Sequence, residues 1–331
     1  MTERATALVE SPLQLLGALE AVHAGVVTTP VEVRWRGTVP GLAQAVAAVR
    51  AEPLPTGFDL VRAGRASARD LPRAGRTYVA GDVFSGLAQA GLALARPGRL
   101  VLLDDGLATV EAVRRLAAHD GPLVRPGAPA GRARRALGAL AVRRVRATAR
   151  PGRGVVLCTA LDPAPADRAA LAAAGIDVVT HRFDWVAGLP PAPPVPEPVV
   201  VVGSGLVADG LVRPDAYVAW VAGVAASAAA SGGTCYVPHR RHDPAVLARI
   251  AALPGVRVPP AGPPVELRLR SLGPGQKVVC LLSTAYRSLR LVLARSGADV
   301  ELAGVAPHWW TDRADARLRE HLETAAAGGA R

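Results

Sequence analysis

Strand-like runs alternate with amphipathic helical segments along most of this chain. The strand-like runs fall at 5–9, 31–36, 77–79, 99–103, 155–158 and 177–180, and then at 199–202, 234–237, 256–258, 277–282 and 300–302. Helices are predicted near 41–51, 84–95, 107–118 and 164–174, and again near 213–231, 243–253, 284–295 and 312–326. Strands that alternate with helices predict mostly parallel sheets covered by helices on both faces. The predicted fold class is therefore α/β.

A proline-rich stretch at 188–198 interrupts this alternation. It reads GLPPAPPVPEP, which cannot continue a helix or an inner strand and indicates an extended, fairly stiff connector. A chain of 331 residues also fits two cores better than one. Two Rossmann-like domains joined by a linker form the architecture called GT-B, in which ligands bind at the carboxyl ends of the strands, here in a central cleft. We expect domains at 1–190 and 199–311, a linker at 191–198, and a C-terminal helix and tail at 312–331.

Composition agrees with small-residue helices packed on Val and Leu strands. Half of the residues are hydrophobic, yet the chain has only 3 Phe, 4 Tyr, 5 Trp and 1 Met. Cys158, Cys235 and Cys280 each lie inside an apolar run, which favours small core residues in a reducing compartment over a disulfide framework or a zinc site. Without an apolar leader at the N-terminus or a sufficiently long apolar stretch, we expect a cytoplasmic, soluble protein.

The formal net charge of +12 raises the question of a nucleic-acid partner. Lys277 is the only lysine, so the charge reflects an arginine skew that coding bias also produces, and no nucleic acid is expected. The densest basic stretch has helical spacing and is typical of a solvated helix face. The alternative is contact with an acidic acceptor or peripheral contact with an anionic membrane surface, on the inner face. This stretch contains Arg132, Arg134, Arg135, Arg143, Arg144, Arg146 and Arg150.

Asp104 and Asp105 come directly after the apolar run at 99–103, which is typical of a strand buried on both faces. Both carboxylates are therefore expected at the carboxyl end of a strand. Adjacent acids raise one another's pKa, and a partly desolvated one can act as a general base toward a hydroxyl. The same Asp-Asp-Gly sequence also occurs in ordinary turns, and it is not an Asp-x-Asp metal motif.

Two later strands also end in polar residues. His239 follows the run at 234–237, and an imidazole flanked by guanidinium groups can hold and protonate a phosphate oxygen. Ser283 and Thr284 end the run at 277–282 and open a helix, where hydroxyls and free backbone N–H groups suit an anion. Simple N-capping would use the same two residues.

Gly203 and Gly205 follow the run at 199–202 in a G-x-G-x-x-A pattern, which weakly matches a dinucleotide-binding turn. The next strand lacks the acidic residue that would hold a ribose hydroxyl, although arginines there would tolerate a 2′-phosphate. The pattern therefore favours the first turn of a nucleotide-binding domain of another kind, with an NADP-binding oxidoreductase as the alternative.

The order of these motifs resembles bacterial sialyltransferases of the GT-B type, most closely the lipooligosaccharide sialyltransferases and their polysialyltransferase relatives. The resemblance spans most of the chain, and its specific part is the order of short motifs. These motifs lie at 11–16, 77–80, 103–106, 202–203, 236–240 and 282–285. The resemblance implies an inverting transferase that moves sialic acid, or a related nonulosonic acid, from a CMP-activated donor to a sugar hydroxyl of a glycan. It implies no metal or other cofactor.

The resemblance also implies roles for single residues. Asp104 would be the base, with Asp105 as the close second, and His239 would act on the CMP phosphate as general acid or clamp. The phosphate would be bound by Ser283 and Thr284. Nearby nucleotide contacts would come from Gly203, Pro238 and Arg240, and the acceptor side would include Ser11 and Gln14. Arg240 stands where the family usually has proline. Alternatives are a GT-B enzyme with another nucleotide-sugar donor, an epimerase-like relative, and a non-catalytic protein that binds nucleotides, anions or nucleic acid.

Overall fold

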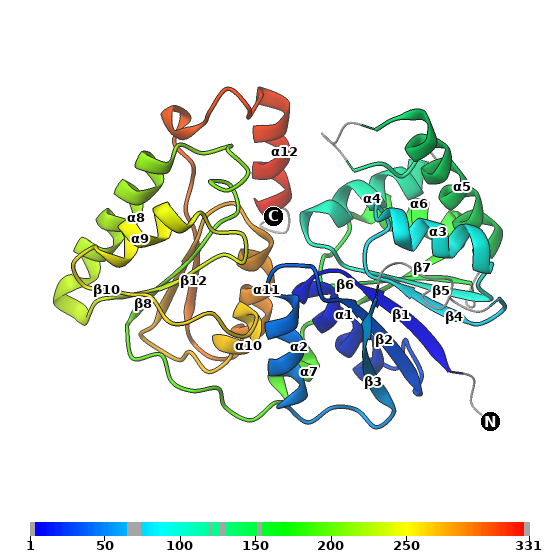
Figure 1. The fold of residues 1–331 in the computed structure, drawn as a ribbon, viewed down its shortest axis with the longest axis horizontal. Coiled ribbons are helices and arrows are strands. Elements are labelled where there is room, and N and C mark those ends of the chain that lie inside the picture. The colour runs from blue at the N-terminus through cyan, green and yellow to red at the C-terminus, as the bar shows by residue number, and fades with distance from the viewer. Residues whose placement is uncertain (1–3, 65–73, 119–120, 126–129, 151–153, 328–331) are drawn as a thin grey trace. The chain divides into compact units, whose positions relative to one another are not determined.

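The computed structural model describes residues 4–64, 74–118, 121–125, 130–150 and 154–327. The chain divides into two compact units, Met1–Trp185 and Val186–Arg331 (Figure 1). Each unit contains one parallel β-sheet with helices on its faces, as the alternating sequence pattern predicts.

The first unit has a seven-stranded parallel sheet in the order β3-β2-β1-β4-β5-β6-β7. Its strands are β1 (Ala5–Val9), β2 (Val31–Arg36), β3 (Phe58–Ala63), β4 (Thr77–Ala80), β5 (Arg99–Leu103), β6 (Val155–Thr159) and β7 (Ile176–Thr180). Its helices are α1 (Pro12–His23), α2 (Leu42–Arg50), α3 (Gly86–Ala95), α4 (Leu107–Ala118), α5 (Arg132–Thr148), α6 (Pro165–Ala173) and the short α7 (Asp184–Ala187), which crosses into the second unit.

The core of this unit lies on both faces of the central strands. Leu100 and Leu102 of β5 and Leu157 of β6 are almost fully buried beneath α3 to α6. On the other face, α1 buries Leu15, Leu16 and Leu19. Strand β5 is therefore covered on both sides, which explains its uninterrupted apolar sequence.

The second unit has a five-stranded parallel sheet in the order β10-β9-β8-β11-β12. Its strands are β8 (Val199–Val202), β9 (Thr234–Val237), β10 (Val256–Arg257), β11 (Lys277–Cys280) and β12 (Asp299–Leu302). Its helices are α8 (Pro214–Ala228), α9 (Pro244–Ala251), α10 (Val265–Arg268), α11 (Thr284–Val292) and α12 (Ala316–Ala327), with short 3-10 turns at Ala229–Ser231 and Pro307–Trp309. The helix near the C-terminus packs on this unit, where Ala326 is buried in the same core as Trp310 and Tyr217.

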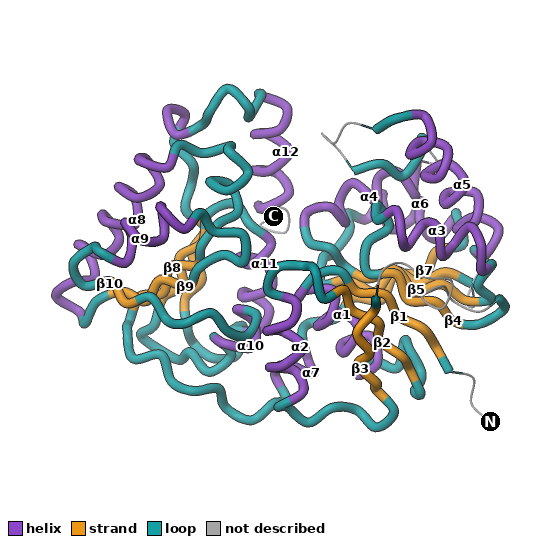
Figure 2. The backbone as a smooth tube through the Cα atoms, viewed as in Figure 1, coloured by secondary structure: helices purple, strands orange, loops and turns teal. Residues whose placement is uncertain are grey.

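The proline-rich stretch at 188–198 forms neither helix nor strand (Figure 2). Hydrogen bonds hold it on the second unit. The Ala192 N–H donates to Ser271 Oγ at 2.6 Å, and the Gln276 side-chain amide donates to the carbonyl oxygens of Val195 and Glu197 at 2.8 and 3.1 Å. These contacts leave the segment extended but anchored, as befits a stiff connector.

His181 is a buried histidine just past β7. Only 3% of it is exposed, its ring packs edge-on against Phe183 with 4.9 Å between centroids, and neither ring nitrogen has a hydrogen-bond partner in the described part of the chain. Burial lowers the pKa of His181 to about 4, although Asp184 works in the opposite direction. The ring is therefore neutral in the folded protein near pH 7.

Acid should destabilise the fold through His181. A histidine whose folded pKa lies below its unfolded value supports the folded state above about pH 6.5 and loses that support as the pH falls toward 4. We expect His181→Leu to reduce the loss of unfolding free energy between these pH values by an amount on the order of 1–3 kcal/mol. Chemical denaturation across this range measures the effect, with the exposed His23→Leu as the control. Parallel pH curves for wild type and His181→Leu would contradict the expectation.

Candidate functional site

Polar side chains of the first unit gather at the carboxyl ends of β1, β4, β5 and β6. These strands are neighbours in the sheet, so the segments that follow them lie along one edge. The segment after β1 provides Ser11 and Gln14, the one after β4 provides Asp82, and the one after β5 provides Asp104 and Asp105.

Asp104 is bound entirely within the protein. Its Oδ1 accepts from the Gly106 N–H at 2.7 Å and from Thr109 Oγ1 at 2.8 Å. Its Oδ2 accepts from Thr159 Oγ1 at 2.9 Å and from the Ala160 N–H at 3.1 Å. With only 4% of Asp104 exposed, this carboxylate links the loops after β5 and β6 and offers little access to a substrate.

Asp105 is oriented differently and is 18% exposed at its side chain. The Gln14 side-chain amide donates to its Oδ1 at 2.6 Å, and Arg125 contacts its Oδ2 at 2.9 Å. Burial raises the pKa of Asp105, while Arg125 and Gln14 work in the opposite direction. An accessible carboxylate with a raised pKa has the properties of a general base, so the geometry favours Asp105 over Asp104 for that role.

Ser11 and Gln14 both contact the Asp105 carboxylate. Ser11 caps α1, accepts from the Gln14 N–H at 3.2 Å and lies 3.5 Å from Asp105 Oδ1. The Gln14 side-chain oxygen accepts from the Glu10 N–H at 2.6 Å, which fixes the amide so that its nitrogen faces Asp105. A Cβ on Gly81 would lie 2.4 Å from that oxygen and 2.8 Å from the Leu8 carbonyl oxygen, so a larger residue there would displace Gln14 or the backbone. Ser11 and Gln14 therefore orient the Asp105 carboxylate.

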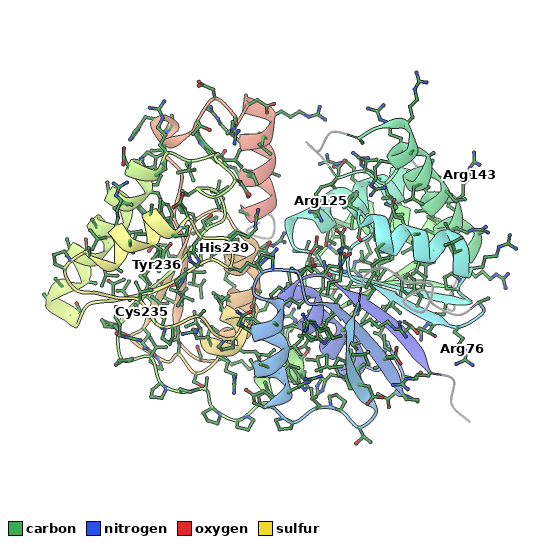
Figure 3. All side chains as sticks on the ribbon, viewed as in Figure 1. Arg76, Arg125, Arg143, Cys235, Tyr236 and His239 are labelled. Carbon is green, nitrogen blue, oxygen red and sulfur yellow. The ribbon has the colours of Figure 1, made fainter. Side chains whose placement is uncertain are left out.

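Asp82 and Arg125 complete the cluster, and sequence reasoning missed both. Arg125, labelled in Figure 3, bridges the two carboxylates, with Nη2 at 2.6 Å from Asp82 Oδ2 and at 2.9 Å from Asp105 Oδ2. Its guanidinium also lies 5.9 Å from the centroid of the Phe84 ring. Burial and the neighbouring Asp105 raise the pKa of Asp82 to about 6, against the opposing effect of Arg125.

Only Asp82 of these two residues has a signal in the sequence. Asp82 lies three residues past the strand-like run at 77–79, so its position just beyond a strand indicates the same edge of the sheet as Asp104 and Asp105. Arg125 follows no strand and belongs to no motif, and its sequence gave no signal for its position.

The second unit gathers its polar groups at the carboxyl ends of β9, β8 and β11, which are adjacent in that order. Gly203 follows β8, His239 comes two residues after β9, and Ser283 precedes α11. The three segments therefore share one edge of this sheet, as their positions in the sequence predict.

The glycines after β8 allow the loop after β9 to approach closely. A Cβ on Gly203 would lie 2.5 Å from the His239 backbone nitrogen, and one on Gly205 would lie 3.0 Å from His239 Cε1. The next helix, α8, begins only at Pro214, so the glycine pattern does not open a helix directly. This arrangement lacks the strand-to-helix turn of a dinucleotide-binding fingerprint.

Alanine at Gly203 is expected to disturb the whole edge. Its Cβ would also lie 3.0 Å from the Val237 carbonyl oxygen, so the backbone itself must move. We expect Gly203→Ala to lower the free energy of unfolding by about 1–3 kcal/mol, the usual cost of overpacking. Urea denaturation measures the change. Gly223→Ala is a matched control, because its Cβ meets nothing within 4 Å inside helix α8. Equal stability of Gly203→Ala and wild type would show that the close contact between the loops after β8 and β9 does not contribute to the free energy of unfolding.

His239 is held as a neutral hydrogen-bond donor. The Arg241 N–H donates to its Nδ1 at 3.2 Å, which leaves the ring proton on Nε2. Burial, together with Arg241 and Arg240, lowers the pKa of His239 to about 4. The side chain of Arg241 forms a two-point ion pair with Asp209, with Nη2 at 3.0 Å from Oδ2. The neutral ring can donate from Nε2 to an anion.

Ser283 occupies the N-cap position of α11 with an extended backbone, φ −156° and ψ 159°. Its side chain makes no capping hydrogen bond, although capping is the usual use of a serine at this position. Thr284 is the first residue of the helix, where unpaired backbone N–H groups and the helix dipole favour an anion. Pro238 and Arg240 flank His239 on the neighbouring loop.

Two buried tyrosine hydroxyls hold the loop after β8 in place. Tyr217 and Tyr236 place their hydroxyl oxygens 3.1 Å apart, and the Ser204 N–H donates to Tyr217 Oη at 3.3 Å. In this way α8 and β9 fix the loop that carries the glycines. Among the residues that the structure describes, no three His, Cys, Asp or Glu side chains are grouped so that they could hold a metal ion.

Comparisons with known proteins identify the fold. The chain is similar to the α/β-galactoside α-2,3-sialyltransferase of the luminous marine bacterium Photobacterium phosphoreum, with 7% identity, a TM-score of 0.53, and coverage of 97% of this chain and 95% of the other. It is also similar to the 2,6-sialyltransferase of Photobacterium sp. JT-ISH-224, solved with CMP and lactose, with 12% identity, a TM-score of 0.52, and coverage of 98% and 76%. A plant protein, UGT2 of Phytolacca americana complexed with UDP-2-fluoroglucose and pterostilbene, has 12% identity, a TM-score of 0.45, and coverage of 98% and 94%.

The two similarities above a TM-score of 0.5 confirm the predicted α/β class, with two parallel sheets in a GT-B-like fold. A scan of protein-family models and a search of the curated proteins found no match to the chain. In the part of the chain that the structure describes, no helix is long and apolar enough to span a membrane.

Proposed function

We propose that the chain is an inverting glycosyltransferase that moves sialic acid, or a related nonulosonic acid, from a CMP-activated donor to a sugar hydroxyl of a glycan. Three observations support this proposal: the GT-B-like fold, the order of the sequence motifs, and the chemistry of the two polar edges. The edge of the first unit offers an accessible carboxylate, and the edge of the second offers donors suited to a phosphate.

The observation that carries the proposal is that hydrogen bonds fix the Asp105 carboxylate while leaving it partly accessible. Gln14 and Arg125 each contact one of its two oxygens, while both oxygens of the neighbouring Asp104 already accept hydrogen bonds from within the protein. In the proposed reaction the acceptor hydroxyl oxygen attacks the anomeric carbon, the bond from that carbon to the phosphate oxygen breaks, and CMP leaves with the electron pair. Asp105 takes the hydroxyl proton.

The phosphate-binding groups act mainly in the transition state. Departure of CMP builds negative charge on its phosphate, so donors aimed at that phosphate lower the barrier more than they strengthen ground-state binding. We assign the Nε2–H of His239, the hydroxyls of Ser283 and Thr284, and the N-terminus of α11 to this role. A pKa of about 4 makes His239 a clamp for the phosphate in preference to a proton donor.

The proposed reaction needs no metal, because these donors and nearby arginines such as Arg240 meet the charge on the phosphate. Gly203 would keep the loops after β8 and β9 close together beside the nucleotide, and Pro238 would shape the loop after β9. The acceptor would contact the first unit near Ser11 and Gln14, which hold the base.

A thermal-shift panel tests the donor class directly. We expect CMP and CMP-sialic acid to raise the melting temperature of the intact chain, and UDP, UDP-glucose and NADP to leave it unchanged. Stabilisation by UDP-sugars alone would favour a GT-B enzyme with another donor. Stabilisation by NADP alone would favour an oxidoreductase, and equal stabilisation by every nucleotide and by free phosphate would favour a non-catalytic anion-binding protein.

A further inference from the structure

Helix α5 of the first unit carries a row of arginines on its outer side. Arg132, Arg135, Arg143 and Arg146 follow one another at intervals of three, eight and three residues, which places them on one side of a helix. Gly138, Ala141, Val142 and Val145 form its buried side. Figure 3 shows Arg143 projecting outward from α5, away from the sheet.

Three arginines of this row have no acidic partner among the described residues. Helix α5 contains no Asp or Glu, and no acidic side chain in the described part of the chain lies within ion-pair distance of Arg132, Arg135 or Arg143. By contrast, Arg134 points inward, where it donates to the Gln89 side chain and the Phe84 carbonyl oxygen and so fastens α5 to α3. Arg132, Arg135 and Arg143 are therefore available to a partner, and the packing of α5 against α3 fixes their positions.

Two exposed leucines lie on α5 and on its neighbour α3. Among the described residues only three large hydrophobic side chains are exposed, and two of them lie on α3 and α5, which pack against each other. Leu94 on α3 is 68% exposed and Leu140 on α5 is 37% exposed. Arginines combined with exposed leucines suit an anionic bilayer, where guanidinium groups meet the headgroups and leucines enter the boundary of the acyl chains. A nucleic-acid surface would instead combine basic groups with polar or aromatic side chains.

We propose that the outer surface of α3 and α5 docks on an anionic phospholipid bilayer as a peripheral membrane-binding surface. The proposal is independent of the proposed catalytic function, because it rests on the charges and leucines of these two helices alone. Binding should weaken steeply with salt, since the attraction to the lipid headgroups is screened.

Vesicle co-sedimentation of the intact chain tests this surface. We expect the protein to sediment with vesicles of phosphatidylcholine containing about a quarter of phosphatidylglycerol, and not with phosphatidylcholine alone. Raising the salt from about 0.05 M to about 0.5 M should release it. One arginine near an anionic bilayer strengthens binding about fivefold, so Arg135→Ala with Arg143→Ala should weaken it about thirtyfold. Leu94→Ser with Leu140→Ser should weaken it without changing its salt dependence.

Matched controls separate this surface from general charge. The double variant Arg295→Ala with Arg317→Ala removes the same charge from two exposed arginines of the second unit and should bind vesicles like wild type. Circular dichroism checks that each variant is folded. The proposal is wrong if anionic vesicles do not bind wild type, if both double arginine variants weaken binding equally, or if a duplex DNA competitor binds more tightly than the vesicles and displaces them completely.

Discussion

Asp105→Asn is expected to lower turnover at least about a hundredfold with little loss of stability, because the variant keeps the shape of the side chain but cannot accept the hydroxyl proton. An asparagine whose oxygen faces Gln14 keeps that hydrogen bond and loses the one from Arg125, but Arg125 is partly exposed and keeps its contact with Asp82, so the loss of stability is small. Steady-state release of CMP from CMP-sialic acid in the presence of an acceptor measures turnover, and urea denaturation measures stability.

Asp104→Asn provides the contrasting result. Its carboxylate accepts four hydrogen bonds from Gly106, Thr109, Thr159 and Ala160, and an amide nitrogen at this position would face donors. We expect a loss of at least about 2 kcal/mol in the free energy of unfolding, since buried donors would be left unpaired. If Asp104→Asn is stable and inactive while Asp105→Asn is active, the roles assigned to the two residues must be exchanged.

His239→Ala is expected to lower turnover at least about a hundredfold by removing a donor that acts on the departing phosphate. His239→Asn, whose amide can donate but cannot titrate near neutral pH, should recover part of the loss if the ring acts as a clamp. The pKa of about 4 gives a further expectation: the ring stays neutral from pH 6 to 8, so its contribution to CMP affinity should be constant over that range.

Calorimetric titration of CMP at several pH values, with wild type and both variants, measures this contribution. A bound phosphate raises the pKa of the ring, but a ring that begins near 4 must rise far before it is charged at pH 7. If the difference in CMP affinity between wild type and His239→Ala grows steeply as the pH falls from 8 to 6, His239 binds in its protonated form and acts as an acid. His242→Ala changes an exposed histidine on the same loop and is the control.

Much of the fold could be predicted from the sequence because most strands are buried on both faces. Runs such as Arg99–Leu103 and Val199–Val202 were predicted with the bounds that the structure has. Strand β3 (Phe58–Ala63) was missed because it lies at the edge of its sheet and exposes Asp59, Val61 and Arg62, so its sequence has no continuous apolar run. The short helices α7 and α10 contain four residues each, too few for helical periodicity to be detected.

The candidate site could be predicted only where position along a strand decides it. Asp105, His239 and Ser283 each follow a strand, and parallel strands bring such residues to the same edge within a unit. Position does not reveal which member of an acidic pair has its oxygens occupied by internal hydrogen bonds, and the family resemblance, which favours Asp104, does not reveal it either. Arg125 depends on the path of a coil after α4, and no local pattern specifies that path.

Acceptor-dependent release of CMP is the most direct test of the central claim, that the chain transfers a sugar from a CMP-activated donor. The intact protein is incubated with CMP-sialic acid, and separately with UDP-glucose, against a panel of glycan acceptors, and the products are identified by mass spectrometry and by the anomeric signals in NMR spectra. We predict a sialylated product with inverted anomeric configuration, formed with CMP by wild type and lost in Asp105→Asn. Transfer from UDP-glucose alone, or a sialylated product formed equally by wild type and Asp105→Asn, would contradict the account.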